Sequence, residues 1–475
     1  MDSSSSATPQ RLDLAVLSNL RAEDEPWLSA CYVEPAEFAA MVGARNALIL
    51  GETGSGKTAL RQHLENAWQR RDINDASWLL VRWQFNALAG ASESLAGSPL
   101  ATRQQVQVFD AIARALLTHL VQLPDRWSAA PPWAKATLAW FIRRFLQGDP
   151  QIYVESLVAE HLVLEPVATF LREINTTKDR DLLPPDASPV AVMIELASAL
   201  PRIGLPGVRI LMADVEPWWE AYPTKLVESL VALLATLALF EHPAFAYTFL
   251  LPDSLWSHLS RTPAVERRRI QVFPLRYQEF ELVRIVERRL ALALGRSEAT
   301  LADLGPAQDL RNWLKGCGGV SPRGWLETAR PFLAAHLARQ DASQPLTAQE
   351  YRAIQMSHPP VLWLDPKTDH VVVGWRRVTN LSSGHFAILK YLSDHAGEMC
   401  SRKDLYKEYQ KASYSEYVEK DIKSSDITGV LDSALWRLRA AIEPTPESPT
   451  LLETKRGKGV RLRSPARDWR ERTAT

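Results

Sequence analysis

The sequence predicts an α/β protein in two parts, a parallel sheet wrapped by helices and a smaller mixed α+β domain at the C-terminal end. In the first part, apolar runs of strand length alternate with stretches of helical periodicity, the pattern of strands joined by crossover helices. In the second part, short strand patterns precede three helices and a basic hairpin. The 475 residues are enough for roughly two to four domains.

Composition narrows the class of protein. The chain has 55 Lys and Arg against 55 Asp and Glu, so any affinity for nucleic acid must come from a local basic patch. Apolar residues make up 46% and charged residues 23%, values that exclude a wholly disordered or fibrous chain. Cys31, Cys317 and Cys400 lack paired spacing, so we expect neither a disulfide framework nor a thiolate metal site, and we expect a cytoplasmic setting.

The sequence predicts neither a membrane span nor an export signal. The longest apolar run, Leu230–Phe240, falls short of the roughly 20 residues that a spanning helix needs, and we interpret it as a buried helix. The first residues, Met1–Ser6, lack the basic start and apolar stretch of a signal peptide. We interpret residues 1–25 as a disordered tail and expect no membrane partner.

Strand patterns outline the core, which we place at residues 26–278. The expected strands are Asn46–Leu50, Trp78–Trp83, Val208–Met212, Ala246–Leu251 and Ile270–Phe273. Between the second and the third strand, residues 86–200 have a helical pattern and predict an inserted helical block. After the core we expect a helical lid over residues 279–340, a linker over 341–360 and the C-terminal domain over 361–475.

One motif carries a specific chemistry. It runs Gly51-Glu52-Thr53-Gly54-Ser55-Gly56-Lys57-Thr58 and fits the pattern G-x-x-x-x-G-K-[ST] between an apolar strand and a helix, the context that this pattern requires. The glycines let backbone N–H groups wrap phosphates, Lys57 can reach the outer phosphates, and the Thr58 hydroxyl can ligate Mg²⁺. The motif predicts the parallel sheet of a P-loop NTPase, with a fortuitous glycine turn as the minor alternative.

Acids that follow the later strands are candidates for metal binding and catalysis. Asp214 follows the third strand and is the candidate on the metal side, while Glu216 is placed to polarise the attacking water. A solvated loop acid is the alternative interpretation of Glu216, with Glu220 as a weaker substitute and slow hydrolysis as the consequence. Asp253 follows the fourth strand and is either a sensor of the γ-phosphate or a helix cap.

These features resemble the AAA+ and STAND group of signalling ATPases over about residues 30–338. The resemblance rests on the phosphate loop, the strand before Asp214, the sensor-like strand end and a lid helix opened by Pro322-Arg323. It implies that Lys57, Thr58 and Asp214 bind ATP and Mg²⁺, that Arg323 is a second sensor, and that the chain self-associates in a nucleotide-dependent switch. Arg267–Arg269 lie where this group places an arginine finger, and solvated surface arginines are the other interpretation.

The C-terminal domain contains a helix with a distinct outward face. Leu431, Leu435, Leu438 and Ile442 fall on one side at spacings of four, three and four residues, which predicts a buried stripe. The residues left outward are Ser433, Trp436, Arg437 and Ala440. A basic hairpin with two glycines at its tip follows at Thr454–Leu462, and the domain as a whole has 20 Lys and Arg against 16 Asp and Glu.

This order resembles the winged-helix effector domain of response regulators of the OmpR/PhoB type. Leu435–Glu443 corresponds to the recognition helix of that family and Thr454–Leu462 to its wing. The resemblance implies that the outward face with Ser433 and Trp436 enters the major groove of double-stranded DNA and that Arg437 reads base edges. It also implies backbone contacts from the wing residues Lys455, Arg456, Lys458 and Arg461. The polar segment Lys411–Ser425 occupies the place where the family can touch RNA polymerase, or it is a surface loop.

These features support two hypotheses about function. The first is an ATP-binding, self-associating ATPase that regulates transcription by nucleotide-controlled DNA binding. The second is a sensor or effector ATPase of a bacterial defence system, in which the helical insertion detects an unknown trigger protein or ligand. In that case the winged helix is a protein-interaction or autoinhibitory module. In either case we expect the protein to bind ATP and Mg²⁺ and to hydrolyse ATP to ADP and phosphate, with slow hydrolysis as the alternative.

Overall fold

The computed structural model describes residues 22–71, 78–85, 100–149, 152–153, 155–156, 173–174, 183–184, 187–339, 344–365, 367–413 and 424–468. The chain falls into two compact units. The described residues of one unit lie within Glu34–Thr53 and Lys57–Leu275, and those of the other lie within Met1–Val33, Gly54–Gly56 and Arg276–Thr475. Across the described residues, no helix has both the length and the apolar character needed to cross a membrane.

The unit with Lys57–Leu275 is built on a parallel sheet. Its strands are β1 (Ala47–Gly51), β2 (Leu79–Gln84), β3 (Val208–Ala213), β4 (Phe245–Pro252) and β5 (Gln271–Pro274). They lie in the order β2-β3-β4-β1-β5, and every neighbouring pair is parallel. All residues of β1 and β4 are buried, as expected for central parallel strands covered on both faces.

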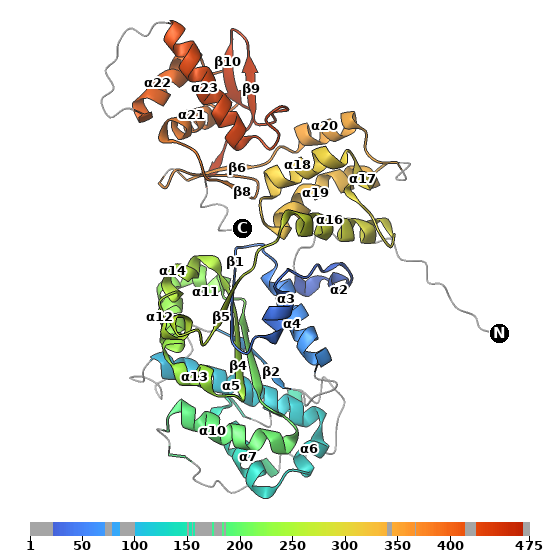
Figure 1. Cartoon of the computed structure of the whole chain (residues 1–475), viewed down its shortest axis with the longest axis vertical. Coiled ribbons are helices and arrows are strands. Elements are labelled where there is room, and N and C mark those ends of the chain that lie inside the picture. The colour runs from blue at the N-terminus through green and yellow to red at the C-terminus, as the bar shows by residue number, and fades with distance from the viewer. Residues whose placement is uncertain are drawn as a thin grey trace, which may run out of the picture. The chain divides into compact units, whose positions relative to one another are not determined.

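Helices cover the two faces of this sheet (Figure 1). On one side lie α3 (Phe38–Gly43) and α4 (Lys57–Arg71). On the other side lie α11 (Glu216–Ala221), α12 (Pro223–Ala235), α13 (Leu237–Glu241) and α14 (Trp256–Leu259). The short elements η4 (Asp253–Leu255) and α15 (Pro263–Glu266) complete the connection from β4 to β5.

Buried Asn46 fixes the start of β1. Its side-chain amide donates to the carbonyl oxygens of Phe240 at 2.9 Å and Arg269 at 3.1 Å. Its side-chain oxygen accepts from the backbone N–H of Tyr247 in β4 at 3.1 Å. Because a buried amide is costly unless it is hydrogen-bonded, these bonds lock β1 against its neighbour and so set the position at which the phosphate loop begins.

A helical block is inserted between β2 and β3. Its described helices are α5 (Leu100–Gln122), α6 (Pro124–Ser128), α7 (Pro132–Phe145), α10 (Pro189–Ala199) and η3 (Leu200–Ile203). Apolar residues of α5, α7 and α10 share one core with the strands of the sheet. The insertion is therefore packed into the same core rather than attached as a separate domain. Residues 86–99 of the predicted block lie outside the described residues.

The second unit contains the lid. Its helices are η1 (Ala22–Asp24), α2 (Leu28–Cys31), α16 (Glu279–Leu294), α17 (Leu301–Leu304), α18 (Ala307–Gly318), α19 (Pro322–Leu337) and α20 (Ala348–Ser357). Glu25 is buried and forms an ion pair with Arg289 of α16 at 2.7 Å. The predicted disordered tail over residues 1–25 was therefore too long at its end, because the paired guanidinium allows Glu25 to be buried. Residues 1–21 lie outside the described residues.

The predicted linker over residues 341–360 was also wrong in part, because it contains helix α20. Thr347 and Glu350 form a capping box, which satisfies the first N–H groups of this helix. The ring of Tyr351 stacks on Phe332 of α19, with ring centroids 5.1 Å apart. The aromatic contact attaches the capped helix to the lid.

The C-terminal domain has a four-stranded sheet, three helices and a hairpin. Its strands are β6 (Leu362–Asp365), β7 (His370–Val373), β8 (Arg376–Val378), β9 (Leu452–Lys455), β10 (Gly459–Leu462) and β11 (Arg467–Asp468), and its helices are α21 (Ser383–Asp394), α22 (Arg402–Ser413) and α23 (Ser424–Ile442). The sheet order is β11-β6-β7-β8, and β9 and β10 pair as an antiparallel hairpin. Residues 414–423, most of the segment considered for RNA polymerase contact, lie outside the described residues.

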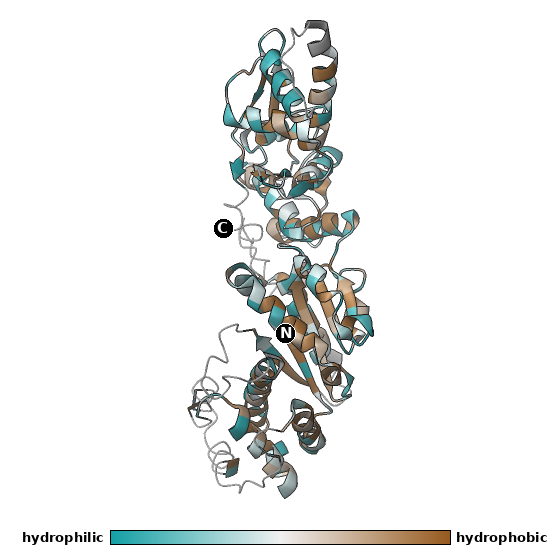
Figure 2. Ribbon diagram, turned by 90° about the vertical axis from the view of Figure 1, so that its left-hand side faces the viewer, coloured by the Kyte–Doolittle hydropathy of each residue, from teal (hydrophilic) through white to brown (hydrophobic). Residues whose placement is uncertain are grey.

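These elements confirm the predicted fold class, a P-loop parallel sheet with a helical insertion and a helical lid, followed by a winged-helix domain. Figure 2 shows the apolar residues concentrated in the strands of the sheet, and hydrophilic residues along the outer helices. In the winged-helix domain, a separate core forms between the sheet and the three helices.

Candidate functional site

The phosphate loop occupies the turn between β1 and α4. Gly54 and Gly56 have φ angles of +79° and +85°, values that L side chains rarely adopt, so glycine permits the bend. The buried hydroxyl of Ser55 has no hydrogen-bond partner within the described structure. The N–H groups in the first turn of α4 also lack intrahelical acceptors. The loop thus presents several donors and a helix N-terminus, the arrangement that suits a phosphate.

Lys57 is held at the loop by three oxygens. Its ammonium group donates to the carbonyl oxygens of Gly51 at 2.8 Å and Glu52 at 3.0 Å. It also forms an ion pair with the carboxylate of Glu216 at 3.0 Å. Thr58 follows as the second residue of α4 and is half-buried. These contacts place the ammonium group across the loop, where phosphate oxygens could replace the protein oxygens.

The two candidate acids both face α4. Glu216 begins α11 and contacts Lys57, whereas Asp214 lies 3.8 Å from Arg61, one turn further along α4. Asp214 has a φ angle of +57°, so the backbone turns sharply directly after β3. Its side chain is 51% exposed. The structure thus pairs Glu216 with Lys57 and places Asp214 beside Arg61, and Glu220 lies exposed in α11.

The other candidates of this unit lie on its surface. Asp253 is exposed as the first residue of η4. The N-cap residues of η4 and α14 are Pro252 and Leu255, so Asp253 caps neither helix. The exposed Arg267–Arg269 follow α15, and Arg269 pairs with Glu241 at 2.8 Å. The sensor role of Asp253 stays a prediction.

The tip of the phosphate loop, Gly54–Gly56, belongs to the same compact unit as the lid. The carbonyl oxygen of Gly54 accepts hydrogen bonds from the Ser321 hydroxyl at 3.0 Å and from the backbone N–H of Arg323 at 3.3 Å. Ser321 is the N-cap of α19, and its oxygen also accepts from the N–H of Gly324. The first turn of α19, which includes Arg323, therefore lies against the tip of the loop.

Helix α23 presents the outward face that its periodicity predicts. Leu431, Leu435, Leu438 and Ile442 are buried in the domain core. The exposed residues on the other face are Ser433, Trp436, Arg437 and Ala440. Trp436 is 69% exposed, which leaves a large apolar surface in water for one residue. An exposed aromatic residue beside an exposed arginine is typical of a binding face.

The wing divides its basic residues into two groups. Glu453 in β9 forms ion pairs with Arg461 at 2.7 Å and with Lys455 at 3.3 Å. The hydrogen bond from Arg461 is the main reason that the pKa of Glu453 lies below its usual range. Arg456 and Lys458 are exposed at the hairpin tip and have no ion pair within the described residues. Two of the four predicted phosphate contacts are thus already paired with a carboxylate.

Buried Glu443 joins the end of α23 to the hairpin, and sequence reasoning missed it. One carboxylate at the end of α23 accepts from the N–H groups of Thr450, Leu451 and Leu452, at distances of 2.6–3.1 Å. It thereby ties the end of the recognition helix to the first strand of the wing. The only sequence signal was an acid directly after the apolar stripe, which resembles any surface glutamate.

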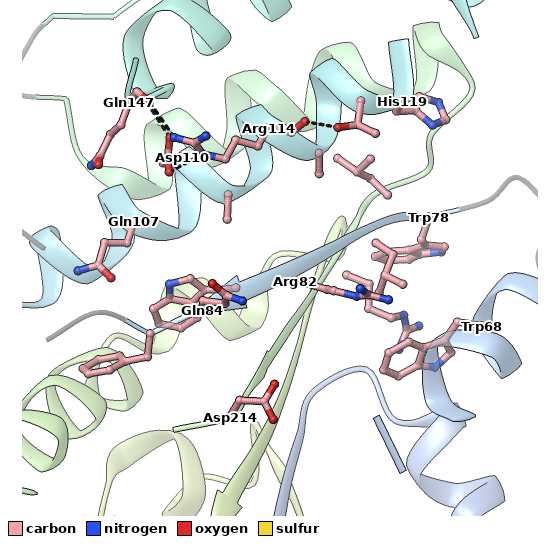
Figure 3. Close-up of a pocket in the computed structure, with 18 of the residues that line it drawn as sticks. Trp68, Trp78, Arg82, Gln84, Gln107, Asp110, Arg114, His119, Gln147 and Asp214 are labelled. Atoms are coloured by element: carbon pink, nitrogen blue, oxygen red, sulfur yellow. Dashed lines mark hydrogen bonds and ion pairs between the residues drawn. The ribbon is translucent and has the colours of Figure 1, made fainter. Parts of the chain in front are cut away.

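A cavity of about 1450 Å³ beside the edge strand β2 was also missed (Figure 3). One wall is the polar face of α5, with Asp110, Arg114 and His119, and β2 contributes Arg82. Burial, and secondarily Arg126, lower the pKa of His119 to about 4, so its ring is neutral near pH 7. The lining extends to Asp214. Because the lining comes from α4, β2, α5, β3 and α11, which are far apart in the sequence, no single pattern predicts it.

The C-terminal domain matches a known family. Residues 376–462 match the family described as "Transcriptional regulatory protein, C terminal". The match covers β8, the three helices and the wing, and so confirms the predicted resemblance of this domain.

Solved structures of similar overall length also match. One is the ORC2 protein of Aeropyrum pernix in its ADPNP–ADP complexes, which has 14% sequence identity and a TM-score of 0.34. The match covers 97% of this chain and 96% of that chain. The ORC1 protein of Aeropyrum pernix in complex with DNA matches with 13% identity, coverage of 95% and 94%, and a TM-score of 0.35. Cdc6p of Pyrobaculum aerophilum matches with 12% identity, coverage of 96% and 94%, and a TM-score of 0.32. Identities and scores at this level do not carry a function across.

Proposed function

We propose that this protein is an ATP-binding P-loop ATPase of the AAA+/STAND type that binds double-stranded DNA through its winged helix under nucleotide control and self-associates on binding ATP. The observation that carries the proposal is the presence, in one chain, of a complete phosphate loop and of a transcription-regulator domain with an exposed recognition helix. In this proposal the first half of the chain binds nucleotide and the second half binds DNA.

The nucleotide half is supported by the chemistry of the loop. The orphaned Ser55 hydroxyl, the two left-handed glycines and the N-terminus of α4 fit a chain of phosphates. Lys57 exchanges its carbonyl ligands for phosphate oxygens, which also releases Glu216 from their ion pair. Thr58 and Asp214 would hold Mg²⁺. The metal, when bound, neutralises charge that develops on the phosphates.

Hydrolysis depends on the fate of Glu216. While it is paired with Lys57, its carboxylate is occupied by the ammonium group and does not face a water molecule placed for attack. Once phosphate oxygens bind the ammonium group of Lys57, Glu216 is released to orient and deprotonate the attacking water. Arg323 and Asp253 are the proposed residues that sense the nucleotide. The reaction converts ATP and water to ADP and phosphate.

The DNA half is supported by the outward face of α23 and the tip of the wing. Arg437 reads a base edge in the major groove, beside Ser433 and the apolar surface of Trp436. Arg456 and Lys458 contact phosphates, while Lys455 and Arg461 contribute less because Glu453 neutralises part of their charge. A single domain with two unpaired wing cations binds weakly, so self-association supplies affinity by linking two domains on one duplex.

The test is binding of the full chain to a DNA fragment from upstream of its own gene, at fixed salt, with and without ATP–Mg²⁺. We expect tighter binding with ATP–Mg²⁺ in wild type and no such gain in Lys57→Ala. Arg437→Ala combined with Arg456→Ala should abolish DNA binding while ATP binding is kept. Unchanged DNA binding in that double variant contradicts the proposal at its central step.

The cavity beside β2 favours a second candidate, the sensor ATPase of a bacterial defence system. The cavity joins the helical insertion to β2 and reaches Asp214, so an occupant would contact both the insertion and the nucleotide-binding unit. This candidate predicts no sequence-selective DNA footprint under any nucleotide condition. It also predicts that cells carrying the gene resist phage infection, and that filling the cavity with Ala111→Trp removes resistance while ATP binding is retained.

A further inference from the structure

The lid segment Gly316–Arg323 lies between the tip of the phosphate loop and the winged helix, all within one compact unit. On one side, Ser321 and Arg323 donate to the carbonyl oxygen of Gly54. On the other side, the carbonyl oxygens of Gly316 and Cys317 accept hydrogen bonds from Arg376 and Trp375, both at 2.6 Å. The same short segment therefore holds both functional elements.

Trp375 touches both sides of this junction. A Cβ atom built on Gly54 would lie 3.3 Å from Cζ3 of the Trp375 ring, so the indole lies directly beside the phosphate loop. A Cβ atom on Gly324, in the first turn of α19, would lie 2.6 Å from the Cβ atom of Trp375, so only glycine permits this approach. The indole N–H donates to the carboxylate of Glu327 at 2.8 Å. The ring is thus fixed by the lid while it contacts the loop.

The neighbouring residue continues the path to the recognition helix. Arg376 donates to the carbonyl oxygens of Ala441 at 2.9 Å and Ile442 at 3.4 Å, which end α23. These carbonyl groups belong to the last turn of the helix and have no intrahelical donor. A Cβ atom on Gly316 would lie 2.6 Å from the Cα atom of Pro444, just after α23. A displacement of the lid segment therefore moves the end of the recognition helix as well.

We propose that Trp375 is a positioning residue that couples the phosphate loop to the recognition helix through the contacts Gly54–Trp375 and Arg376–Ala441. The inference rests on the nucleotide half of the proposed function and adds the route of regulation. Phosphates that bind the loop fix Gly54, and with it the lid segment, Trp375 and the end of α23. ATP thereby presents the recognition helix in one orientation. The coupling is reciprocal, so a ligand of the recognition helix must raise the affinity for ATP by the same factor.

Hydrogen exchange of backbone amides in the full chain tests the proposal without DNA. ATP binding is first measured by calorimetry for every variant. In wild type, ATP–Mg²⁺ should slow exchange in residues 436–443 by about fivefold or more, the lower end of ordinary allosteric couplings. In Trp375→Ala this slowing should vanish while ATP still binds. Trp375→Phe keeps an aromatic ring at this position and loses the bond to Glu327, so it should retain most of the slowing.

Two variants serve as matched controls and one guards against misfolding. Trp363→Ala removes another half-buried tryptophan of the same domain, and Arg377→Ala removes the exposed arginine beside Arg376, so both should keep the wild-type response. If Trp375→Ala does not fold, Ser321→Ala removes one bond to Gly54 from the lid side and should reduce the slowing without touching the winged helix.

The outcomes separate the two proposals. The inference is overturned if ATP still slows amide exchange of residues 436–443 in Trp375→Ala. It is also overturned if the wild-type protein binds ATP and the exchange rates of these residues do not change. Either result leaves the nucleotide half of the proposed function standing. Wild type that binds no ATP overturns both. Slowing that disappears in Trp375→Ala and survives in both controls supports the coupling.

Discussion

The phosphate loop and the wing both offer positive potential to phosphate groups, but they build it from different atoms. The loop uses backbone N–H groups, two left-handed glycines and one lysine on the helix that follows. The wing uses long side chains on a hairpin, and Glu453 pairs with two of the four candidates. A site made from backbone is specified by a local motif, whereas the charge of a side-chain site depends on which carboxylates fold beside it.

The largest effect should come from Lys57→Ala. Removing the ammonium group leaves the phosphates with backbone donors only, so the affinity for ATP should fall on the order of 100-fold or more, as expected for a charge-assisted bond to phosphate. Calorimetric titration of ATP–Mg²⁺ measures the change, with Lys225→Ala in α12 as the control. An ATP affinity within about threefold of the wild-type value would show that the loop binds phosphate without the Lys57 ammonium group.

Glu443→Ala tests whether the wing is held by a single buried carboxylate. The change leaves the N–H groups of Thr450, Leu451 and Leu452 without their acceptor, at a cost of about 3 kcal/mol in the free energy of unfolding. Urea denaturation of the full chain, monitored by a probe in the winged helix, measures it. The control is Glu447→Ala, because Glu447 is exposed four residues later and should change little.

Arg437→Ala removes the proposed base contact from α23. Affinity for the selected DNA sequence should fall by about 1–3 kcal/mol, while binding to unrelated DNA changes little. Competition binding with specific and scrambled duplexes measures the two values. If both affinities fall equally, Arg437 contacts phosphate rather than a base, and the outward face of α23 reads no sequence.

Arg456→Ala and Arg461→Ala compare an unpaired with a paired cation of the same wing. Arg456→Ala should reduce the slope of log affinity against log salt by about one, because one phosphate contact is lost. Arg461→Ala should change the slope less, since Glu453 already neutralises part of its charge. Equal slopes for the two variants would mean that DNA displaces Glu453, and that the ion pair does not set the charge of the wing.

Local patterns predicted the parts of the molecule whose chemistry is local. The five strands of the core, the phosphate loop and the outward face of α23 each follow from residues close together in the sequence. The ends of Trp78–Trp83 and Val208–Met212 were predicted to within one residue, because these buried strands are continuous apolar runs. The errors fell at residues 1–25 and 341–360, where buried Glu25 and the capped helix α20 depend on distant partners.

The sequence by itself determined that a glycine-rich loop at Gly51–Thr58 joins a strand to a helix and that a winged helix lies at the C-terminal end. Spacing of glycines and of apolar residues is enough for that, because both sites form from contiguous segments. Only the tertiary structure decided which cations are already neutralised by a carboxylate of the protein. Lys57 pairs with Glu216, and Arg461 pairs with Glu453, only in the folded chain. The contact of Trp375 with the phosphate loop has the same origin, because it joins residues about 320 positions apart through a lid that brings them together.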